Sequence, residues 1–305
     1  MKTIVITGAT SFIGVHLIEE LAKQEKYIIY AVIRPQSSNK CRLDSIAGIH
    51  VLECDLTEMN NLSAMLPDRI DVFYHLAWEG ARRPQRDDAM LQENNYKAAV
   101  EAFRLAEAKG CQVFVGAGSQ AEYGKTVGEI TEDYPANPVT EYGKHKLKAY
   151  QEICRLSKGK GIVVKWPRIF SVYGKYDYEG TLLMSAIKKF QCNEPLDMTA
   201  GVQNWNYLYV RDVAKMLLYA GTEPCEDGVY NFASKDNRRL CEYINELKKI
   251  VQSDSKLNFG AIPYGSEGVV SFEPIIDKFL NCFPDFTFTA FTMGVREMLE
   301  SAREK

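Results

Sequence analysis

Tyr142 and Lys146, spaced one helical turn apart, are the residues of this sequence best suited to acid–base chemistry. Residues four apart on a helix share one face, so the phenol and the ammonium would be neighbours. A phenol has a pKa of about 10 and is a poor acid–base catalyst at neutral pH, but a nearby ammonium favours the phenolate and lowers that pKa. The chain has no other Tyr-x-x-x-Lys. We therefore expect Tyr142 to exchange a proton with a substrate oxygen.

A hydroxyl group precedes this pair at the end of an apolar run. Residues Gln112 to Gly116 predict a strand, and Ser119 follows it after two small residues. Ligands of open α/β sheets bind beyond the carboxyl ends of the strands. Ser119 would there hydrogen-bond the same substrate oxygen as Tyr142. The alternative is a serine that only stabilises a turn at the strand end.

A glycine turn at the start of the chain predicts a dinucleotide site. Residues Thr3 to Ile6 read as a strand, Gly8 and Gly14 frame the turn, and a helical pattern follows. Such a turn lets the backbone approach a pyrophosphate at a helix N-terminus. Ser11 stands where a middle glycine is usual, either to touch a phosphate or merely as a tolerated replacement. The expected cofactor residues of the turn are Gly8, Thr10, Ser11, Phe12, Ile13 and Gly14.

Arg34 bears on the choice of cofactor. NAD-binding proteins normally have an acidic residue at the end of the second strand, about 20 residues past the glycine turn, for the ribose 2′-hydroxyl. This chain has Ile33-Arg34 there. A guanidinium clamps a phosphate with two hydrogen bonds, so Arg34, together with Ser37, Ser38 or Lys40, favours NADP. NAD is the alternative, with Arg34 an ordinary solvated side chain.

The elements that must position these residues alternate along the first half of the chain. Strand-like runs at 28–33, 51–52, 72–76, 112–116 and 162–165 are separated by helical patterns. Alternation of this kind predicts an α/β fold, a Rossmann-type doubly wound parallel sheet with helices on both faces. After Pro167 the pattern weakens. We expect a dinucleotide-binding domain from 1–166 plus about 207–232, and a smaller, C-terminal substrate-binding domain from about 167–206 and 233–305.

The composition excludes several function classes. The 305 residues carry a formal net charge of −3, which gives no electrostatic reason to expect nucleic acid or a membrane surface as partner. No secretory segment or run of about 20 apolar residues is present, so we expect a soluble, cytoplasmic protein. The eight cysteines form no Cys-x-x-Cys and only four histidines accompany them, so we expect neither metal nor disulfides.

Further motifs appear in a recognisable order. They are Asp55-Leu56, His75-Leu76-Ala77-Trp78, Asn95, Tyr123-Gly124, the segment 167–174 (PRIFSVYG) and the segment 209–214 (YVRDVA). Together with the glycine turn, Ser119, Tyr142 and Lys146, this set resembles the extended short-chain dehydrogenase/reductase family, the NAD(P)-dependent sugar-nucleotide epimerases and dehydratases. The resemblance spans nearly the whole chain. It implies a catalytic triad of Ser119, Tyr142 and Lys146.

The resemblance also implies contacts to the cofactor. Asp55 and Leu56 would flank the adenine, Ala77 would lie beside the cofactor, and Lys146 would also bind the nicotinamide ribose. The other implied cofactor residues are Leu76, Trp78, Asn95, Tyr142, Pro167, Arg168 and Ile169.

Departures from the family pattern concern the substrate. Gln120 and Ala121 stand where the 4,6-dehydratases have the Asp-Glu pair that removes water, so dehydration is not expected. Ser171 replaces an asparagine that holds the sugar nucleotide. The stretch 203–206 lacks the arginine that UDP-galactose epimerases use for the diphosphate, so other cations must replace it or the substrate is unusual. The candidate substrate residues are Gln120, Ser171, Trp205, Arg238 and Arg239.

Three functions are consistent with these residues. A reductase consumes NADPH, whereas a 4-epimerase recycles a tightly held NAD, so Arg34 favours an NADPH-dependent reductase of a nucleotide-activated 4-keto-deoxysugar with Tyr142 as proton donor. The alternative is a nucleotide-sugar 4-epimerase. A remote alternative is a dinucleotide-binding sensor without turnover, against which the intact triad argues.

Assembly is indicated only by the resemblance. Residues 95–109 and 146–156 predict helices with apolar stripes, which normally face the sheet. In the family the corresponding helices also form a four-helix contact, so the resemblance implies a homodimer.

Overall fold

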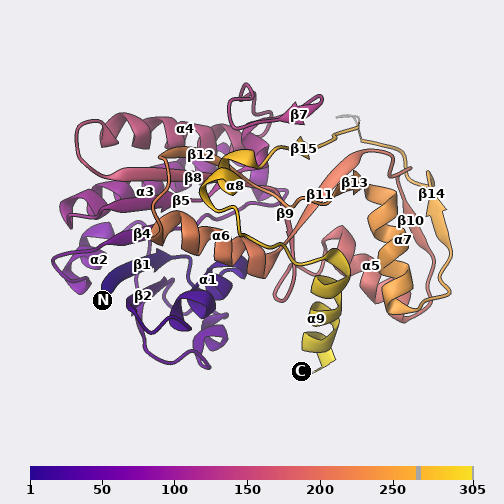
Figure 1. Ribbon diagram of the computed structural model, residues 1–305, viewed down its shortest axis with the longest axis horizontal. Helices are drawn as coiled ribbons and strands as arrows, with labels where there is room; N and C mark the ends of the chain where they lie inside the picture. Colours follow the sequence, from indigo (N-terminus) through magenta and orange to yellow (C-terminus); the bar gives the residue numbers. More distant parts are fainter. Residues whose placement is uncertain (266–268, 304–305) are drawn as a thin grey trace. The chain divides into compact units, whose positions relative to one another are not determined.

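The computed structural model describes residues 1–265 and 269–303, which fall into two units (Figure 1). Unit 1 contains residues 1–124, 135–169 and 213–232. Unit 2 contains residues 125–134 and 170–212 and the described residues from 233 onward. No helix among the described residues has the length and apolar character needed to cross a lipid bilayer.

Unit 1 is built on a parallel sheet. In spatial order its strands are β12 (Gly228–Phe232), β8 (Val163–Ile169), β5 (Val113–Gly116), β4 (Val72–His75), β1 (Lys2–Thr7), β2 (Tyr27–Ile33) and β3 (Ile49–Glu53). A short strand β6 (Gly118–Ser119) pairs with the end of β8. The sheet confirms the predicted Rossmann-type fold.

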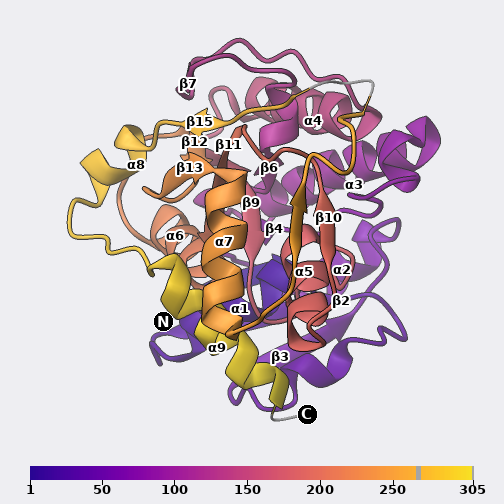
Figure 2. The same ribbon diagram turned by 90° about the vertical axis from the view of Figure 1, so that its right-hand side faces the viewer.

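Helices cover both faces of this sheet (Figure 2). On one face lie α2 (Met59–Met65), α3 (Ala89–Ala108) and α4 (Glu141–Ser157), and on the other α1 (Phe12–Ala22) and most of α6 (Val210–Thr222). Phe73, Phe114 and Phe103 are fully buried in the first layer. On the opposite face the Tyr74 hydroxyl donates to the Leu217 carbonyl of α6 at 3.1 Å. The apolar stripe of α3 therefore faces the sheet, as its pattern predicts.

Strand β8 continues past the position where its sequence suggests an end. The apolar run indicated a strand to Lys165, but β8 extends through Pro167 to Ile169. Proline lacks a backbone donor and is rare inside sheets. Here β5 pairs with β8 only as far as Lys165, and β6 resumes the pairing at Arg168. The missing donor of Pro167 thus lies opposite an interruption of the ladder.

Unit 2 consists of short sheets and helices. β11 (Asn204–Tyr209) pairs with β9 (Ser171–Tyr173) and β13 (Asn237–Arg239), β10 (Leu196–Met198) with β14 (Leu257–Phe259), and β7 (Glu129–Ile130) with β15 (Glu273–Pro274). The helices are α5 (Leu182–Gln191), α7 (Leu240–Val251), α8 (Asp277–Cys282) and α9 (Phe291–Arg303). Rings of Tyr173, Tyr207, Tyr243 and Phe291 pack together in its core.

One strand differs from expectation. The pattern from residue 207 suggested a strand that rejoins the large sheet. Instead β11 pairs with β9 and β13, and β12 supplies the edge of the large sheet beside β8. Both strands are apolar and of similar length, so only their tertiary partners distinguish them.

His75, at the end of β4, is a buried histidine whose environment lowers its pKa. Its Nδ1 lies 2.9 Å from the Thr7 hydroxyl of β1, and only 3% of the residue is exposed. Burial lowers the pKa of the imidazole to about 3, whereas a histidine in the unfolded chain has a pKa of about 6.5. Below pH 6.5 the unfolded chain therefore binds a proton that the native state does not.

We expect this difference to weaken the fold as the pH falls from 6.5 toward 3. Between pH 7 and pH 5 it removes about 2 kcal/mol from the free energy of unfolding. Urea unfolding of His75→Gln at the two pH values should lack this loss. His50→Gln, at an exposed histidine, should retain it. An equal loss in His75→Gln would contradict the prediction.

Candidate active site

Helix α4 begins at Glu141 and so includes both Tyr142 and Lys146. Because these residues are four apart, their side chains lie on one face of the helix. Thr140 caps the helix, accepting a hydrogen bond from the Gly143 amide at 3.1 Å. Gly143 also lets the helix approach the 3₁₀ turn Gln120–Glu122, since a Cβ there would lie 2.5 Å from the Ala121 carbonyl oxygen. The start of α4, which carries Tyr142 and Lys146, therefore lies against the turn that follows Ser119.

Ser119 completes the group. Its hydroxyl accepts a hydrogen bond from the Ala121 amide at 3.2 Å, and the side chain faces Tyr142 closely enough to lower the pKa of that phenol. The Lys146 ammonium donates to the Ala117 carbonyl at 2.6 Å, two residues before Ser119. The structure thus brings together the three residues that the sequence proposed as a triad.

An aromatic ring and a second cation surround the tyrosine. The Trp78 ring meets the Tyr142 ring edge-on, with centroids 6.1 Å apart, and the Lys146 ammonium lies 3.8 Å from the Trp78 centroid. The Arg86 guanidinium lies 4.8 Å from the Tyr142 centroid. Sequence reasoning missed Arg86, because it sits in the loop before α3 and belongs to no motif.

The protonation of the pair is governed by burial. Burial raises the pKa of Tyr142, and the Ser119 hydrogen bond and the Arg86 charge only partly oppose this. Burial also lowers the pKa of Lys146 to about 7, which Glu122 opposes. The sequence suggested that the lysine lowers the pKa of Tyr142 below its ordinary value. In the cofactor-free chain the direction is the reverse, because desolvation of the phenolate outweighs the nearby charges.

The glycine turn has the geometry of a dinucleotide cradle. Gly8 has φ +73°, and a Cβ on it would lie 2.7 Å from the Ala77 amide nitrogen. A Cβ on Gly14 would lie 2.3 Å from the Gly8 carbonyl. Ser11 is the N-cap of α1 and accepts from the Gly14 amide at 3.0 Å. Its side chain is thus used to start the helix, whose first amides have no acceptor within the helix and suit a phosphate.

Hydroxyl and guanidinium groups lie near the end of β2, where the sequence predicts the adenosine end of the cofactor. Arg34 follows β2, with its guanidinium 3.7 Å from the Glu79 carboxylate. The hydroxyls of Thr10 and Ser37 are 3.2 Å apart, and Arg42 donates to the Thr10 carbonyl at 3.0 Å. These donors fit the ribose and phosphate end of a dinucleotide.

Other residues implied by the resemblance have structural partners. The carboxylate of Asp55 accepts from the amide and hydroxyl of Thr57, which hold the pKa of Asp55 below its ordinary value. The Asn95 amide makes two hydrogen bonds to the backbone of Glu79, at 2.8 and 3.0 Å. Leu56 packs against the core, and Leu76 is buried where the chain leaves β4.

The end of β8 holds a buried ion pair. Pro167, Arg168 and Ile169 are all buried, and the Arg168 Nε lies 2.9 Å from a carboxylate oxygen of Glu122, a residue with 0% exposure. Arg168 thus points at a carboxylate of its own unit. Sequence reasoning missed Glu122, because its partner is 46 positions away.

The candidate substrate residues are divided between the units. Gln120 is in unit 1, and Ser171, Trp205, Arg238 and Arg239 are in unit 2. Buried polar atoms of Gln120 and Trp205, Oε1 and Nε1, have no hydrogen-bond partner within residues 1–265 and 269–303. Arg238 pairs with Asp236 and Glu246, and Arg239 precedes α7 as its N-cap. Among the described residues no three His, Cys, Asp or Glu side chains are arranged to hold a metal ion.

Comparison with known proteins agrees with this geometry. The CDP-abequose synthase of Salmonella muenchen is 26% identical over 266 residues, 86% of this chain and 85% of that protein. The UDP-glucose 4-epimerase of Thermotoga maritima, solved with UDP-glucose, has a TM-score of 0.88 at 18% identity, covering 99% of both chains. The UDP-glucuronic acid 4-epimerase of Bacillus cereus, solved with UDP-glucuronic acid and NAD, has a TM-score of 0.83 at 22% identity, again covering 99% of both.

A family model decides the assignment. The model described as the NAD dependent epimerase/dehydratase family matches residues 4–233, which include the glycine turn, Ser119, Tyr142 and Lys146. The chain therefore belongs to the NAD dependent epimerase/dehydratase family, whose members act on nucleotide sugars.

Proposed function

We propose that this enzyme is a nucleotide-sugar 4-epimerase in which Tyr142 is the acid–base residue. The observation that carries the proposal is that Tyr142 and Lys146, one turn apart on α4, lie against the stretch that carries Ser119, where Lys146 donates to the Ala117 carbonyl at 2.6 Å. Gln120 and Ala121 offer no carboxylate pair to remove water. The 4-epimerases among the similar structures favour this reaction over the one-way reduction that the sequence suggested.

The three residues divide the acid–base work. Ser119 orients the sugar C4 oxygen, and the Tyr142 phenolate takes the hydroxyl proton as the C4–H bond breaks. When bound, the dinucleotide supplies the hydride acceptor and donor. Tyr142 gives its proton back to the C4 oxygen when the ketone is reduced from the other face. One proton and one hydride thus leave and return in each turnover. Burial disfavours the phenolate that begins it, and the Ser119 side chain, the Arg86 charge and the Lys146 ammonium offset that cost.

Residues of unit 2 are proposed to bind the rest of the substrate. The unpartnered indole nitrogen of Trp205 supports this role, as does the unpartnered oxygen of Gln120 in unit 1. A buried polar atom without a partner costs about 1–3 kcal/mol, which a ligand hydrogen bond would offset. Trp205 and Arg238 occupy paired positions of β11 and β13. Ser171 and Arg239 remain further candidates.

A second candidate function rests on the adenosine end of the cofactor site. Arg34, with the Thr10 and Ser37 hydroxyls nearby, favours the 2′-phosphate of NADP over the 2′-hydroxyl of NAD. NADPH is the cofactor of a reductase, so this feature keeps the nucleotide-sugar 4-ketoreductase as the second candidate.

Removing the Tyr142 hydroxyl tests the proposed function. The purified enzyme is assayed with UDP, dTDP, CDP and GDP sugars, and C4 epimers are separated by chromatography. We expect interconversion of one epimer pair without net loss of NADPH absorbance. Tyr142→Phe should lower turnover about 10²- to 10⁴-fold and leave cofactor affinity unchanged. Tyr30→Phe, on β2, should retain activity.

Two outcomes would contradict these expectations. Undiminished turnover in Tyr142→Phe would reject the tyrosine as proton carrier. Stoichiometric NADPH loss with a 4-keto-6-deoxysugar nucleotide, without epimer interconversion, would replace the epimerase by the reductase.

Exchanging the charge at residue 34 tests the cofactor choice. Arg34→Asp should weaken NADP binding about 10- to 100-fold, because a charge-assisted hydrogen bond is lost and a like charge faces the phosphate. NAD should bind more tightly, since the new carboxylate accepts from the ribose hydroxyls. Fluorescence titration with both dinucleotides measures this, with Lys26→Asp, at the other end of β2, as the control. Unchanged affinities would make Arg34 an ordinary solvated arginine.

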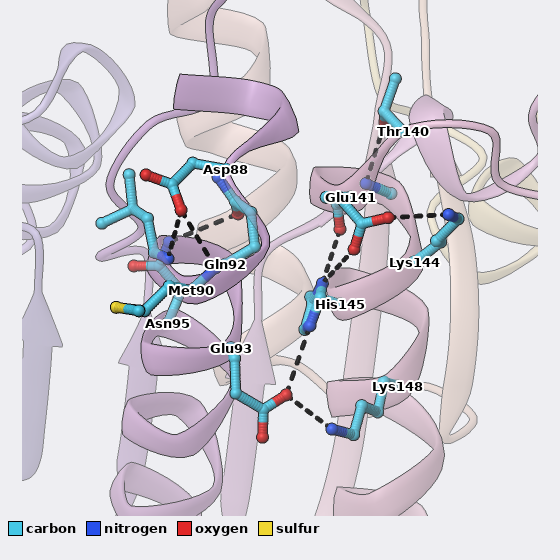
Figure 3. A network of polar contacts seen from close by, with 12 residues as sticks. Asp88, Met90, Gln92, Glu93, Asn95, Thr140, Glu141, Lys144, His145 and Lys148 are labelled. Atoms are coloured by element: carbon cyan, nitrogen blue, oxygen red, sulfur yellow. Dashed lines mark hydrogen bonds and ion pairs between the residues drawn. The ribbon is translucent and has the colours of Figure 1, made fainter. Parts of the chain in front are cut away.

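A homodimer is proposed through α3 and α4. These helices lie side by side, joined where Glu93 accepts from Lys148 at 2.7 Å and lies 3.3 Å from His145 (Figure 3). The other outward groups of the two helices are mostly charged, so an interface there would be largely ionic.

Sedimentation at micromolar concentration should show a dimer that about 1 M salt weakens, because salt screens exposed charges. A monomer at low salt would contradict this.

A further inference from the structure

Glu122 is a buried carboxylate directly behind the catalytic serine. It has 0% exposure, and its Oε1 accepts from the Ser119 backbone amide at 2.8 Å. The Trp166 indole nitrogen lies 3.1 and 3.2 Å from the two carboxylate oxygens. The Arg168 Nε donates to Oε2 at 2.9 Å. The carboxylate thus ties the strand that carries Ser119 to the two residues of β8 beside it.

The fold makes room for this carboxylate at Gly118. A Cβ on Gly118 would lie 2.5 Å from the Trp166 indole nitrogen and 2.8 Å from the Glu122 Oε1. Neither atom is free to move, because both are buried and hydrogen-bonded to each other. Gly118 and Glu122 therefore belong together: the glycine allows the indole and the carboxylate to reach the Ser119 amide.

Aromatic and amide side chains surround the ion pair. Arg168 is 4% exposed, and its guanidinium lies 4.4 Å from the centroid of the Tyr123 ring. The Tyr123 hydroxyl in turn donates to the Asn231 side chain of β12 at 2.6 Å. Buried ion pairs seldom add net stability over apolar replacements. The Glu122–Arg168 pair is therefore better explained by its hold on the Ser119 backbone than by a contribution to stability.

Glu122 and Lys146 hold the same three-residue stretch from two directions. Lys146 donates to the Ala117 carbonyl, and Glu122 accepts from the Ser119 amide. We propose that Glu122 is a positioning residue for the reaction, fixing the Ser119 hydroxyl through its backbone and supplying the negative charge near the Lys146 ammonium. This inference rests on the proposed role of Ser119, Tyr142 and Lys146.

The charge has a definite effect on the pair. Glu122 raises the pKa of Lys146, against the burial that lowers it to about 7, and it also raises the pKa of Tyr142. The other groups that face the pair are His75 from β4, the Trp78 ring and Arg86. The groups that face Glu122 are Arg168, Trp166 and, on α4, Tyr150.

A purely structural role and the proposed role predict opposite shifts. If replacement of Glu122 only loosened the packing, water would enter and the pKa of Lys146 would rise toward its ordinary value. If Glu122 supplies the facing charge, its neutralisation lowers that pKa further. The sign of the shift therefore separates the two roles.

The test is a titration of Lys146 by NMR in the full-length chain. Lysine side chains are labelled with ¹³C at Cε, and Lys146→Met identifies the resonance. Glu122→Gln should lower the pKa of Lys146 by about one unit. Glu122→Asp keeps the charge but withdraws the carboxylate from the Ser119 amide, so it should leave this pKa in place. Glu152→Gln, which removes an exposed carboxylate of α4 paired with Arg155, should also leave it unchanged.

Activity supplies the second readout. Both Glu122 variants should lower turnover about 10- to 100-fold, Glu122→Asp because the serine is displaced and Glu122→Gln because the charge that faces Lys146 is lost. An unchanged or raised pKa of Lys146 in Glu122→Gln would overturn the inference, as would full activity in Glu122→Asp. If Glu122→Gln does not fold, Glu122→Gln/Arg168→Gln leaves no unpaired buried charge and carries the same expectation for the pKa. Failure of the proposed function would show separately, as undiminished turnover in Tyr142→Phe.

Discussion

Burial of the Lys146 charge is the constraint on which the rest of the active site depends. Only 3% of this residue is exposed, and an isolated buried ammonium costs several kcal/mol. The cost is reduced by the Ala117 carbonyl, the Trp78 ring and the Glu122 carboxylate, which come from two segments of unit 1, the one after β4 and the one after β5. The loops after β4 and β5 must therefore hold their places relative to α4, and that requirement fixes the ends of the central strands.

The interruption between β5 and β6 leaves backbone groups beside Ser119 that bond to side chains. After Val115 the strand stops pairing with β8, and pairing resumes at Gly118. The released carbonyl of Ala117 accepts from Lys146, and the Ser119 amide donates to Glu122. Pro167 lies opposite the gap in the neighbouring strand. The serine thus lies at a place where the backbone bonds to side chains as well as to the sheet.

Local patterns foretold those parts of this arrangement that depend on neighbours in sequence. The alternation of strands and helices predicted the fold class, and the Tyr142–Lys146 spacing predicted that both side chains share one face of a helix. Ser11 as an N-cap also follows local rules, although the sequence offered it only as a phosphate contact or a tolerated replacement of the usual glycine. Residues whose meaning depends on distant partners were not foreseen. Glu122 meets Arg168 only through the position of β8 in the sheet. Arg86 reaches the Tyr142 ring only because the loop before α3 returns over α4.

The fold and the triad are compatible with two reactions, epimerisation and reduction. Epimerisation and reduction share the proton transfer at Tyr142, and both need hydride transfer at the same carbon. They differ in whether the dinucleotide stays bound between turnovers. We propose that this property depends on the adenosine end, which Arg34, Thr10 and Ser37 are expected to hold, and not on the triad. The residues that perform the chemistry therefore identify the class of reaction, and those that hold the far end of the cofactor decide which member of the class it is.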